Sequence, residues 1–239
     1  MQKTYTIDIE TTINSGQVFL WNKIEDQWIG VDGRDILILN QSPFRARSLG
    51  SISNFFREDD NLEKILSNIS RDKIVRKAVK QSPGLRLVRQ DPFQCYISFI
   101  CSSNSSIKNI KSMLENLCKK FGTKREFNGY KLHLFPKPEI LANASMKDLI
   151  GCKLGFRAKY VKEASQVVNS GKIDFSWLKK TDYFTALESL KKILGIGNKV
   201  ADCILLFSLD KMDAFPIDRW MQRILLKYYK KNFDVVVEK

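Results

Sequence analysis

The sequence predicts an α+β fold, in which a small N-terminal antiparallel β-sheet lobe precedes a mainly α-helical body that contains a helix-hairpin-helix. Three observations predict this class. Short runs rich in β-branched and aromatic residues fill the region up to about residue 48. From about residue 52 onward, apolar residues recur with the period of about 3.6 residues that is typical of helices. Two such helical segments flank a glycine-rich turn in the C-terminal part.

Four runs predict strands in the N-terminal lobe, at residues 5–9, 17–21, 28–31 and 36–39. The sequence Asp32-Gly33-Arg34-Asp35 has the composition of a tight hairpin turn, so we expect the last two strands to pair antiparallel. Breaks near residues 82–84, 128–129, 136–138 and 170–171 interrupt the helical region. We therefore expect a sheet domain at residues 1–85 and a helical domain at residues 86–239, with the helix-hairpin-helix at about residues 183–209.

A Gly195-Ile196-Gly197 turn joins predicted helices at residues 183–194 and 200–209. Glycine adopts positive φ without strain and leaves no Cβ between the backbone and an approaching group, so we expect positive φ in this turn. The amides of such a turn, with the N-terminus of the next helix, form a site for a phosphate. From the residues alone, a DNA-binding turn and a plain corner between two helices are equally good interpretations.

Lys199 lies in the first turn of the second helix, with Asn198 as the expected N-cap. The positive end of the helix dipole and apolar neighbours disfavour the ammonium form, which favours a neutral, nucleophilic amine. Cys203 follows one helical turn later on the same face. Spacing alone still favours a phosphate contact for Lys199 and a core position for Cys203.

Asp218 follows Pro216 and precedes a helical pattern at residues 219–229, so we expect it to cap that helix. A carboxylate that accepts helix N–H groups stays ionised. It could stabilise positive charge at a sugar carbon, or move protons during an elimination. An ordinary cap is the alternative, and the two roles are compatible.

These residues resemble a known family. The segment 195–203, with Pro216-Ile217-Asp218, is similar to the helix-hairpin-helix and Gly/Pro…Asp signature of base-excision DNA glycosylases, and within that superfamily the 8-oxoguanine DNA glycosylases match best. Three further segments resemble the same family: Ser15-Gly16-Gln17-Val18-Phe19-Leu20-Trp21, residues 91–104 and residues 154–161. Because the matches occur in order from about residue 15 to about residue 229, the resemblance covers most of the chain.

The resemblance implies a bifunctional enzyme that excises 8-oxoguanine from double-stranded DNA and cleaves the abasic site. Lys199 would attack C1′, expel the base and form an imine that permits β-elimination, with Asp218 as the supporting carboxylate. Gly16 would offer its carbonyl oxygen to the N7–H of 8-oxoguanine. Cys203 would pack against the extruded purine.

The resemblance also implies DNA contacts. Asn104 would fill the gap left by the extruded nucleotide, Phe156 would be the wedge, and Arg157 would bind the unpaired cytosine with its fork of donors. Gly195 and Gly197 would hold the DNA backbone in the hairpin turn.

Some positions depart from the family pattern. Phe156 stands where the family has a tyrosine, and Asn109 stands where it has a second cytosine-binding arginine, so selectivity for cytosine should be weaker. Because the chain stops at Lys239, we expect the C-terminal helix that closes the purine pocket to be missing or reduced. Phe233 is the last aromatic residue and therefore the candidate base-recognition residue at that end.

Composition agrees with DNA as the partner. Lys and Arg number 40 against 26 Asp and Glu, for a net charge of +14, and such an excess drives phosphate binding. The cysteines are Cys95, Cys101, Cys118, Cys152 and Cys203, with no C-x-x-C pair. This spacing matches neither a zinc nor an iron–sulfur site, and the single histidine, His133, excludes a multi-histidine site, so no metal site formed by side chains is predicted.

We expect no redox or organic cofactor, although the resemblance allows a monovalent cation at the hairpin backbone. An odd cysteine count without a signal peptide predicts an intracellular, DNA-associated protein, in the cytoplasm and nucleoid of a prokaryote or the nucleus of a eukaryote. No apolar run is long enough to cross a membrane, so we expect no membrane partner. We also expect a monomer.

Two alternatives stay open. The first is a glycosylase for another damaged purine, such as an alkylated base. Enzymes of that kind can release an already cationic base with water and lack the lysine, so Lys199 counts against this alternative. The second is a non-catalytic helix-hairpin-helix module that binds phosphates, and the presence of Lys199 together with Asp218 counts against it.

Overall fold

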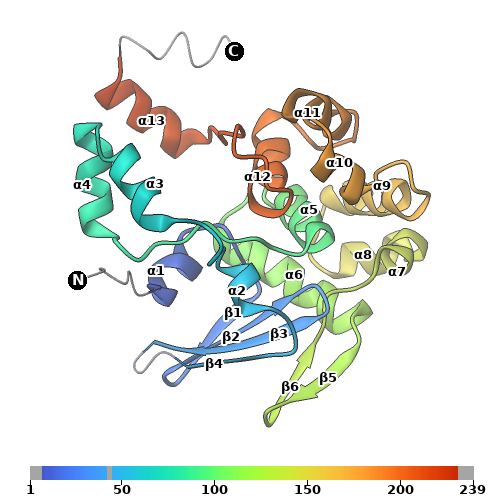
Figure 1. Cartoon of the computed structure of the whole chain (residues 1–239). Helices are drawn as coiled ribbons and strands as arrows, with labels where there is room; N and C mark the ends of the chain where they lie inside the picture. The colour runs from blue at the N-terminus through green and yellow to red at the C-terminus, as the bar shows by residue number, and fades with distance from the viewer. Residues whose placement is uncertain (1–6, 42–44, 231–239) are drawn as a thin grey trace.

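The computed structural model describes residues 7–41 and 45–230, and its α+β architecture confirms the predicted class (Figure 1). A four-stranded antiparallel sheet lies at one end, in the order β1 (Trp21–Ile24), β2 (Gln27–Asp32), β3 (Asp35–Asn40) and β4 (Arg45–Ser48). The predicted hairpin turn is confirmed, because Asp32 pairs with Asp35 across it. The larger part of the molecule is helical and lies above the sheet in Figure 1.

The helices of the described residues, in chain order, are α1 (Ile9–Asn14), α2 (Ile52–Phe55), α3 (Leu62–Ile69), α4 (Lys73–Gln81), α5 (Pro92–Cys101), α6 (Ile107–Phe121), α7 (Pro138–Asn143), α8 (Met146–Gly151), α9 (Arg157–Asn169), α10 (Phe175–Lys180), α11 (Tyr183–Lys191), α12 (Asn198–Ser208) and α13 (Arg219–Tyr228). Within the described ranges, none of these helices is long and apolar enough to cross a membrane. The predicted helix-hairpin-helix is confirmed as α11, the glycine turn and α12.

The predicted strand at residues 5–9 is wrong in its described part, and residues 5 and 6 lie outside the described residues. Helix α1 begins at Ile9, because the carboxylate of Asp8 accepts a hydrogen bond from the backbone N–H of Thr11 at 2.9 Å and caps the first turn. The predicted strand at residues 17–21 is also wrong over most of its length, since β1 begins only at Trp21. Its first residues are held by the side chain of Gln17 instead of by a strand ladder.

A second hairpin interrupts the helical region, where the sequence predicted only a break. Strands β5 (Lys124–Phe127) and β6 (Tyr130–His133) pair antiparallel across Asn128 and Gly129. Asn-Gly is a strong hairpin signal, so this hairpin could have been predicted from its turn residues. It projects beside the main sheet in Figure 1.

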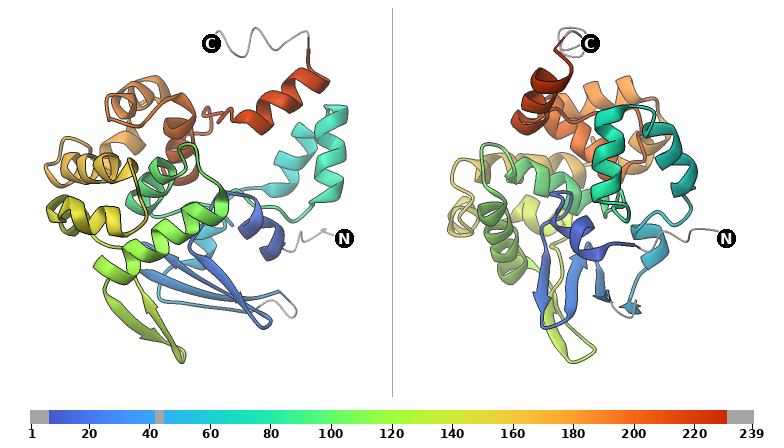
Figure 2. Two further views of the ribbon diagram at one scale, coloured as in Figure 1. Left: turned by 180° about the vertical axis from the view of Figure 1, so that it is seen from behind. Right: turned by 90° about the vertical axis from the view of Figure 1, so that its left-hand side faces the viewer.

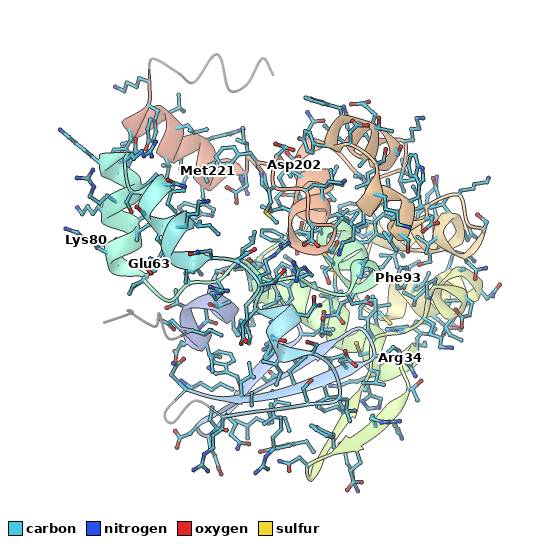
Figure 3. All side chains as sticks on the ribbon, in the orientation of Figure 1. Arg34, Glu63, Lys80, Phe93, Asp202 and Met221 are labelled. Carbon is cyan, nitrogen blue, oxygen red and sulfur yellow. The ribbon has the colours of Figure 1, made fainter. Side chains whose placement is uncertain are left out.

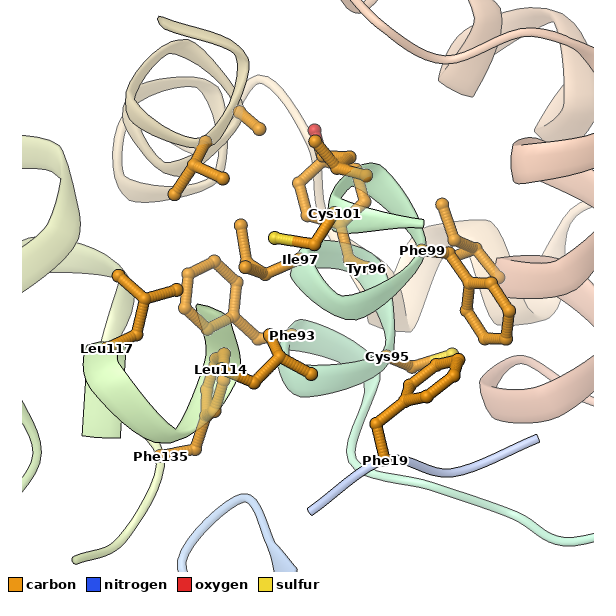
Figure 4. Packing of buried hydrophobic residues seen from close by; sticks show 14 of the residues in the cluster. Phe19, Phe93, Cys95, Tyr96, Ile97, Phe99, Cys101, Leu114, Leu117 and Phe135 are labelled. Carbon is orange, nitrogen blue, oxygen red and sulfur yellow. The ribbon is translucent and has the colours of Figure 1, made fainter. Parts of the chain in front are cut away.

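Helix α5 is the centre of the molecule. All its residues from Phe93 to Cys101 are buried, and it packs against α6, α9 and α12. The figure of the core shows its aromatic residues and cysteines surrounded by side chains from neighbouring elements (Figure 4). Ile29 and Ile38 of the sheet join the same cluster of buried residues, while Trp28 and Leu39 on the other face pack with α1 and α2. Both faces of the sheet are therefore covered.

Helices α3, α4 and α13 form an outlying group on one side of the molecule, as Figure 1 and the left view of Figure 2 show. Neither α3 nor α4 contains a buried residue, and α13 buries one, Leu225. The hydroxyl of Tyr229 donates a hydrogen bond of 2.7 Å to Asp72, which joins the end of α13 to the start of α4. This group therefore stands apart from the core around α5.

Candidate active site

A cavity of about 330 Å³ opens between the loop before β1, helix α5, helix α12 and the start of α13. Its lining consists of Ser15, Gly16, Gln17, Phe99, Lys199, Cys203, Leu206, Phe207, Phe215, Pro216, Asp218 and Met221. The structure thus brings together four of the predicted site residues, Lys199, Asp218, Gly16 and Cys203. Figure 3 labels Met221 on α13 and Asp202 on α12, the two helices that flank this cavity.

The glycine turn directs Lys199 into the cavity. Gly195 has a φ of +87°, whereas Gly197 is extended at φ −97° and ψ −177°, so the positive φ expected of the turn occurs at the first glycine only. Helix α12 begins at Asn198 and its N-cap is Gly197, with no side-chain cap. The prediction of Asn198 as the cap is therefore wrong by one residue, because the extended glycine already occupies the capping position.

The amine of Lys199 is half-buried and contacts Phe99 of α5 and Ser102, the residue that follows this helix. Its Nζ donates a hydrogen bond of 3.3 Å to the hydroxyl of Ser102, and it lies 5.3 Å from the centroid of the Phe99 ring. Among the described residues, no carboxylate lies within ion-pair distance of this Nζ. The amine is therefore neither in bulk solvent nor paired with an acidic neighbour.

Cys203 lies one turn after Lys199 on the same helix and is 3% exposed. Burial raises the pKa of its thiol to about 12, and the nearby charge of Lys199 lowers it only in part. The side chain is therefore a neutral thiol near neutral pH, and not a thiolate. Its place in the lining makes it an apolar contact for whatever fills the cavity.

Asp218 caps α13, as the sequence predicted. Its Oδ1 accepts hydrogen bonds from the backbone N–H groups of Trp220 at 2.9 Å and Met221 at 2.8 Å. These two bonds fix the orientation of the carboxylate at the mouth of the cavity, where the group remains exposed to solvent. The cap and the candidate catalytic position are thus the same arrangement.

The loop that carries Gly16 is held by side chains. Gly16 has a φ of +88°, and Gln17 beside it is buried. The Gln17 amide donates to the carbonyl of Arg86 at 3.0 Å and accepts from the N–H of Val88 at 3.0 Å. Gln90 in turn donates to the Gln17 carbonyl at 2.8 Å. This buried network positions the Gly16 backbone against the cavity.

Three of the predicted DNA contacts lie together beyond the end of α5. Asn104 is exposed in the turn between α5 and α6, with a φ of +50°. Arg157 holds this turn, because its Nε donates to the Ser103 carbonyl at 2.9 Å and its Nη2 to the Asn104 carbonyl at 3.0 Å. The ring of Phe156 is 56% exposed, and the Arg157 guanidinium lies 4.4 Å above it.

The hairpin turn is packed against helix α9. A Cβ at Gly195 would lie 2.6 Å from the ring of Tyr160, whereas a Cβ at Gly197 would meet no atom within 4 Å. Gly195 is thus needed for packing and for its positive φ, and Gly197 leaves the backbone open to an approaching group. The hydroxyl of Tyr183 donates a hydrogen bond of 2.7 Å to the carboxylate of Asp202, and this bond joins α11 to α12.

The sequence did not identify several residues of the site. Phe99 and Ser102 lie within the segment 91–104, but nothing in its spacing places them under the lysine. Phe207 follows Cys203 at the i+4 spacing of a helix, and this signal could have found it. Asn109 is exposed near the start of α6. Phe233 lies outside the described residues.

Comparisons with known proteins agree with this arrangement. Residues 97–232 match the family model of the HhH-GPD superfamily of base excision DNA repair proteins, and residues 1–96 match that of the 8-oxoguanine DNA glycosylase N-terminal domain. A probable N-glycosylase/DNA lyase of Methanothermobacter thermautotrophicus is 35% identical, over 64% of this chain and 55% of that protein. An N-glycosylase/DNA lyase of Arabidopsis thaliana is 28% identical, over 95% of this chain and 68% of that protein.

The chain spans between about half and two thirds of the length of the curated relatives it matches. Among solved structures, the 8-oxoguanine glycosylase/lyase of Clostridium acetobutylicum, in complex with double-stranded DNA containing cytosine opposite 8-oxoguanine, has a TM-score of 0.89 and 31% sequence identity. That alignment covers 94% of this chain and 81% of the other. With its lysine, its capping aspartate and both family models in place, the chain belongs to the 8-oxoguanine DNA glycosylase family of the HhH-GPD superfamily.

Proposed function

We propose that this protein is a bifunctional 8-oxoguanine DNA glycosylase and abasic-site lyase that acts on double-stranded DNA. The observation that carries the proposal is the cavity that Lys199 and Asp218 share, in which the amine has no acidic partner among the described residues. An amine held in this way is available as a nucleophile once it loses a proton.

The chemistry begins with a nucleotide turned out of the duplex into the cavity. The neutral amine of Lys199 forms a bond to C1′ as the bond from C1′ to the base breaks, and the base leaves with the bonding electrons and gains a proton. Loss of a proton from the lysine nitrogen and opening of the sugar give an imine. Removal of a proton from C2′ then expels the 3′ phosphate. The ionised Asp218, fixed by the two N–H groups of α13, stabilises the cationic character at C1′.

Recognition of the base is assigned to Gly16 and Cys203. The Gly16 carbonyl accepts a hydrogen bond from the N7–H that distinguishes 8-oxoguanine from guanine, and loss of one such bond in a dry site costs about 1–3 kcal/mol. Gln17 supports this choice, because its buried hydrogen bonds keep the loop from adapting to guanine. The neutral thiol of Cys203 packs on the purine without adding a charge.

We assign the contacts with the DNA around the lesion to exposed residues that follow α5 and to the hairpin turn between α11 and α12. Asn104 fills the gap that the extruded nucleotide leaves in the duplex, and Phe156 is the wedge. Arg157 binds the unpaired cytosine with those N–H groups that do not donate to the carbonyls of the turn. The backbone around Gly195 and Gly197 holds a phosphate. With Asn109 in place of a second arginine, selectivity for cytosine is weaker, and Phe233 remains the candidate for closing the purine pocket.

The remaining features complete the proposal. The protein acts as a monomer on DNA inside the cell, without a redox or organic cofactor, and residues 1–85 and 86–239 act as its two domains. A monovalent cation at the hairpin backbone is part of the proposal, since the C-terminus of α11 carries the negative end of the helix dipole. Such a cation would supply positive charge near a DNA phosphate.

Borohydride trapping tests the function directly. A duplex containing 8-oxoguanine should be trapped covalently on the native protein, and Lys199→Gln should abolish the trap while keeping salt-sensitive DNA binding. Lys172→Gln, which removes an exposed lysine on the segment after α9, is the matched control and should trap normally. A trap that survives Lys199→Gln, or one that forms only with a duplex containing an alkylated purine, would contradict the proposal.

A further inference from the structure

We propose that the outward face of helix α13 is a further DNA-binding surface, which holds phosphates of the damaged strand next to the cavity. This face consists of four exposed residues: Arg219, Trp220, Arg223 and Lys227. The inference rests on the proposed function, because it takes the cavity as the place of the extruded nucleotide. It follows from the direction in which these side chains leave the helix, from their charge and from the position of the helix start.

Helix α13 turns one side toward the rest of the molecule. Met221 lines the cavity, Leu225 is buried, and the hydroxyl of Tyr229 bonds to the start of α4. These three residues are spaced by four and therefore lie on one side of the helix. At about 100° per residue, Arg223 and Lys227 lie within about 20° of the direction opposite Leu225, and the other two residues of the outward face lie within about 60° of it. The outward face thus points away from the side on which α13 packs.

The outward face carries positive charge only. Helix α13 contains no acidic residue, and its basic side chains form no ion pair with any residue that the structure describes. The nearest acidic residue along the chain is Asp218, whose carboxylate bonds to N–H groups of the first turn. Each strand of DNA carries one negative charge per about 3.4 Å of its axis, so it is complementary to such a face. The helix rises about 12 Å between Arg219 and Lys227, which is enough for a few successive phosphates.

Trp220 and Arg223 form a pair that is suited to a nucleic-acid backbone. Trp220 is 69% exposed, and the guanidinium carbon of Arg223 lies 4.9 Å from the centroid of its ring. Stacking on the ring orients the guanidinium, while its N–H groups stay free to donate to a phosphate. Phe156 and Arg157, which are assigned to DNA contacts above, form a pair of the same kind.

The start of α13 determines which strand the outward face meets. Asp218 lines the cavity and is assigned to C1′ of the damaged nucleotide. The backbone N–H of Trp220 donates to the same carboxylate at 2.9 Å, so the outward face begins within one helical turn of it. The nearest phosphates are then those that flank the damaged nucleotide in its own strand. Arg219, Arg223 and Lys227 therefore bind that strand where it leaves the cavity, and Trp220 packs against its sugars.

The first test is the salt dependence of binding to an undamaged duplex. Arg223→Gln with Lys227→Gln removes two charges from the outward face. Lys124→Gln with Arg125→Gln is the matched control, because it removes an arginine and a lysine from β5, at the opposite end of the molecule in Figure 1.

Each phosphate contact contributes about 0.9 to the slope of log affinity against log salt concentration. The outward-face pair should therefore reduce the slope by about 1.8 and lower the affinity at low salt by about tenfold or more. The control pair should keep the native slope. Equal changes in the two pairs would show a general effect of net charge and overturn the inference.

The second test identifies the strand. The duplex contains a stable abasic analogue, and about three phosphates on each side of it are replaced by uncharged methylphosphonates, in one strand at a time. Replacement in the strand with the analogue should weaken binding of the native protein and the control pair about tenfold more than binding of the outward-face pair, which has already lost the contacts. Replacement in the other strand should affect all three proteins equally. Equal losses for replacement in the strand with the analogue would exclude the assigned contacts.

Quenching of tryptophan fluorescence by acrylamide tests Trp220 itself. A bound undamaged duplex should shield the native protein from acrylamide, and Trp220→Phe should abolish this shielding. Trp177 on α10, which is 49% exposed, provides the control, and Trp177→Phe should keep the shielding. Shielding that persists in Trp220→Phe contradicts the inference. Absence of base release and trapping in the native protein, with these binding results intact, overturns the proposed function instead.

Discussion

Gly16 shows how one residue determines the shape of the loop before β1. Its φ of +88° lies in the left-handed region that favours glycine, yet a Cβ there would meet no atom within 4 Å. The requirement for glycine is thus conformational and not a matter of space. The next residue, Gln17, is held by buried hydrogen bonds, so a shift of the loop cannot relieve backbone strain at position 16.

Gly16→Ala should therefore reduce recognition of the base more than it reduces stability. We expect a loss of about 1–2 kcal/mol in the free energy of unfolding, because an L-residue is strained at positive φ, and a fall of at least about tenfold in release of 8-oxoguanine. Gly129→Ala is the matched control, since Gly129 has a φ of +82° and equally open space in the hairpin of β5 and β6. It should lose similar stability in urea unfolding and keep the native rate. Equal losses of rate in both variants would remove Gly16 from base recognition.

The position of the helix-hairpin-helix depends on contacts with other elements as well as on its own sequence pattern. Its two helices follow from apolar spacing and its turn from two glycines, but the glycines have different tasks. Gly195 lies against the ring of Tyr160, which belongs to α9, while Gly197 begins α12 and faces open space. The position of the hairpin therefore depends on a partner helix that is distant in the sequence.

The two glycines should respond differently to alanine. Gly195→Ala combines strain at a φ of +87° with a contact of 2.6 Å to Tyr160, so we expect a loss of about 2–4 kcal/mol in unfolding free energy together with weaker DNA binding. Gly197→Ala adds a methyl group in open space at extended φ, so stability should change by less than about 1 kcal/mol while affinity for duplex DNA falls. Thermal unfolding and binding titrations measure the two effects. Similar losses of stability at both positions would contradict the view that Gly195 is needed for packing and Gly197 for DNA binding.

At the scale of the whole molecule, Asp210 joins segments that are distant in sequence. Its carboxylate contacts Arg57 at 2.5 Å, Arg89 at 2.9 Å and Lys179 at 2.7 Å. Arg57 is 2% exposed, so its charge depends on this partner. Since Asp210 follows the end of α12, the network ties the helix of Lys199 to α10 and to the residues before α5. The helix that carries Lys199 is thus held at its C-terminal end.

Acid should weaken this network. Burial alone would raise the pKa of Asp210, but hydrogen bonds from Arg89 and Lys179, with the charge of Arg57, outweigh it and lower the pKa to about 2. A carboxylate with a lowered pKa in the folded state stabilises the protein above its ordinary pKa of 3.8, and this contribution is lost as pH falls from about 4 to about 2. The contribution at neutral pH is on the order of 2 kcal/mol.

Asp210→Asn provides the measurement. Asparagine tolerates the φ of +57° at this position, so the variant removes the charge without straining the backbone. In urea unfolding, the difference between native protein and variant should be largest at pH 6–7 and should shrink as pH is lowered toward about 3. A difference that does not depend on pH would show that Asp210 acts through its shape and not through its charge.

Much of the site was predictable because its signals are local. Lys199 in the first turn of a helix, Asp218 as a cap and Cys203 one turn after the lysine all depend on neighbours a few residues away. The same holds for the hairpin at Asp32 and Asp35. The predicted strands at residues 5–9 and 17–21 were wrong, because a capping aspartate and a buried glutamine supplied the backbone partners that a strand ladder would have used.

By itself the sequence determined the fold class, the helix-hairpin-helix and the cap at Asp218, since capping, turn geometry and helical periodicity act between near neighbours. The tertiary structure alone decided that Gly16 and Lys199 line one cavity, that Ser102 contacts the amine, and that Arg157 holds the turn of Asn104. Those contacts join residues that are distant along the chain. They form because α5 buries its apolar residues against α9 and α12, and because Gln17 fixes the loop of Gly16 to the residues before α5; no short segment of sequence contains that information.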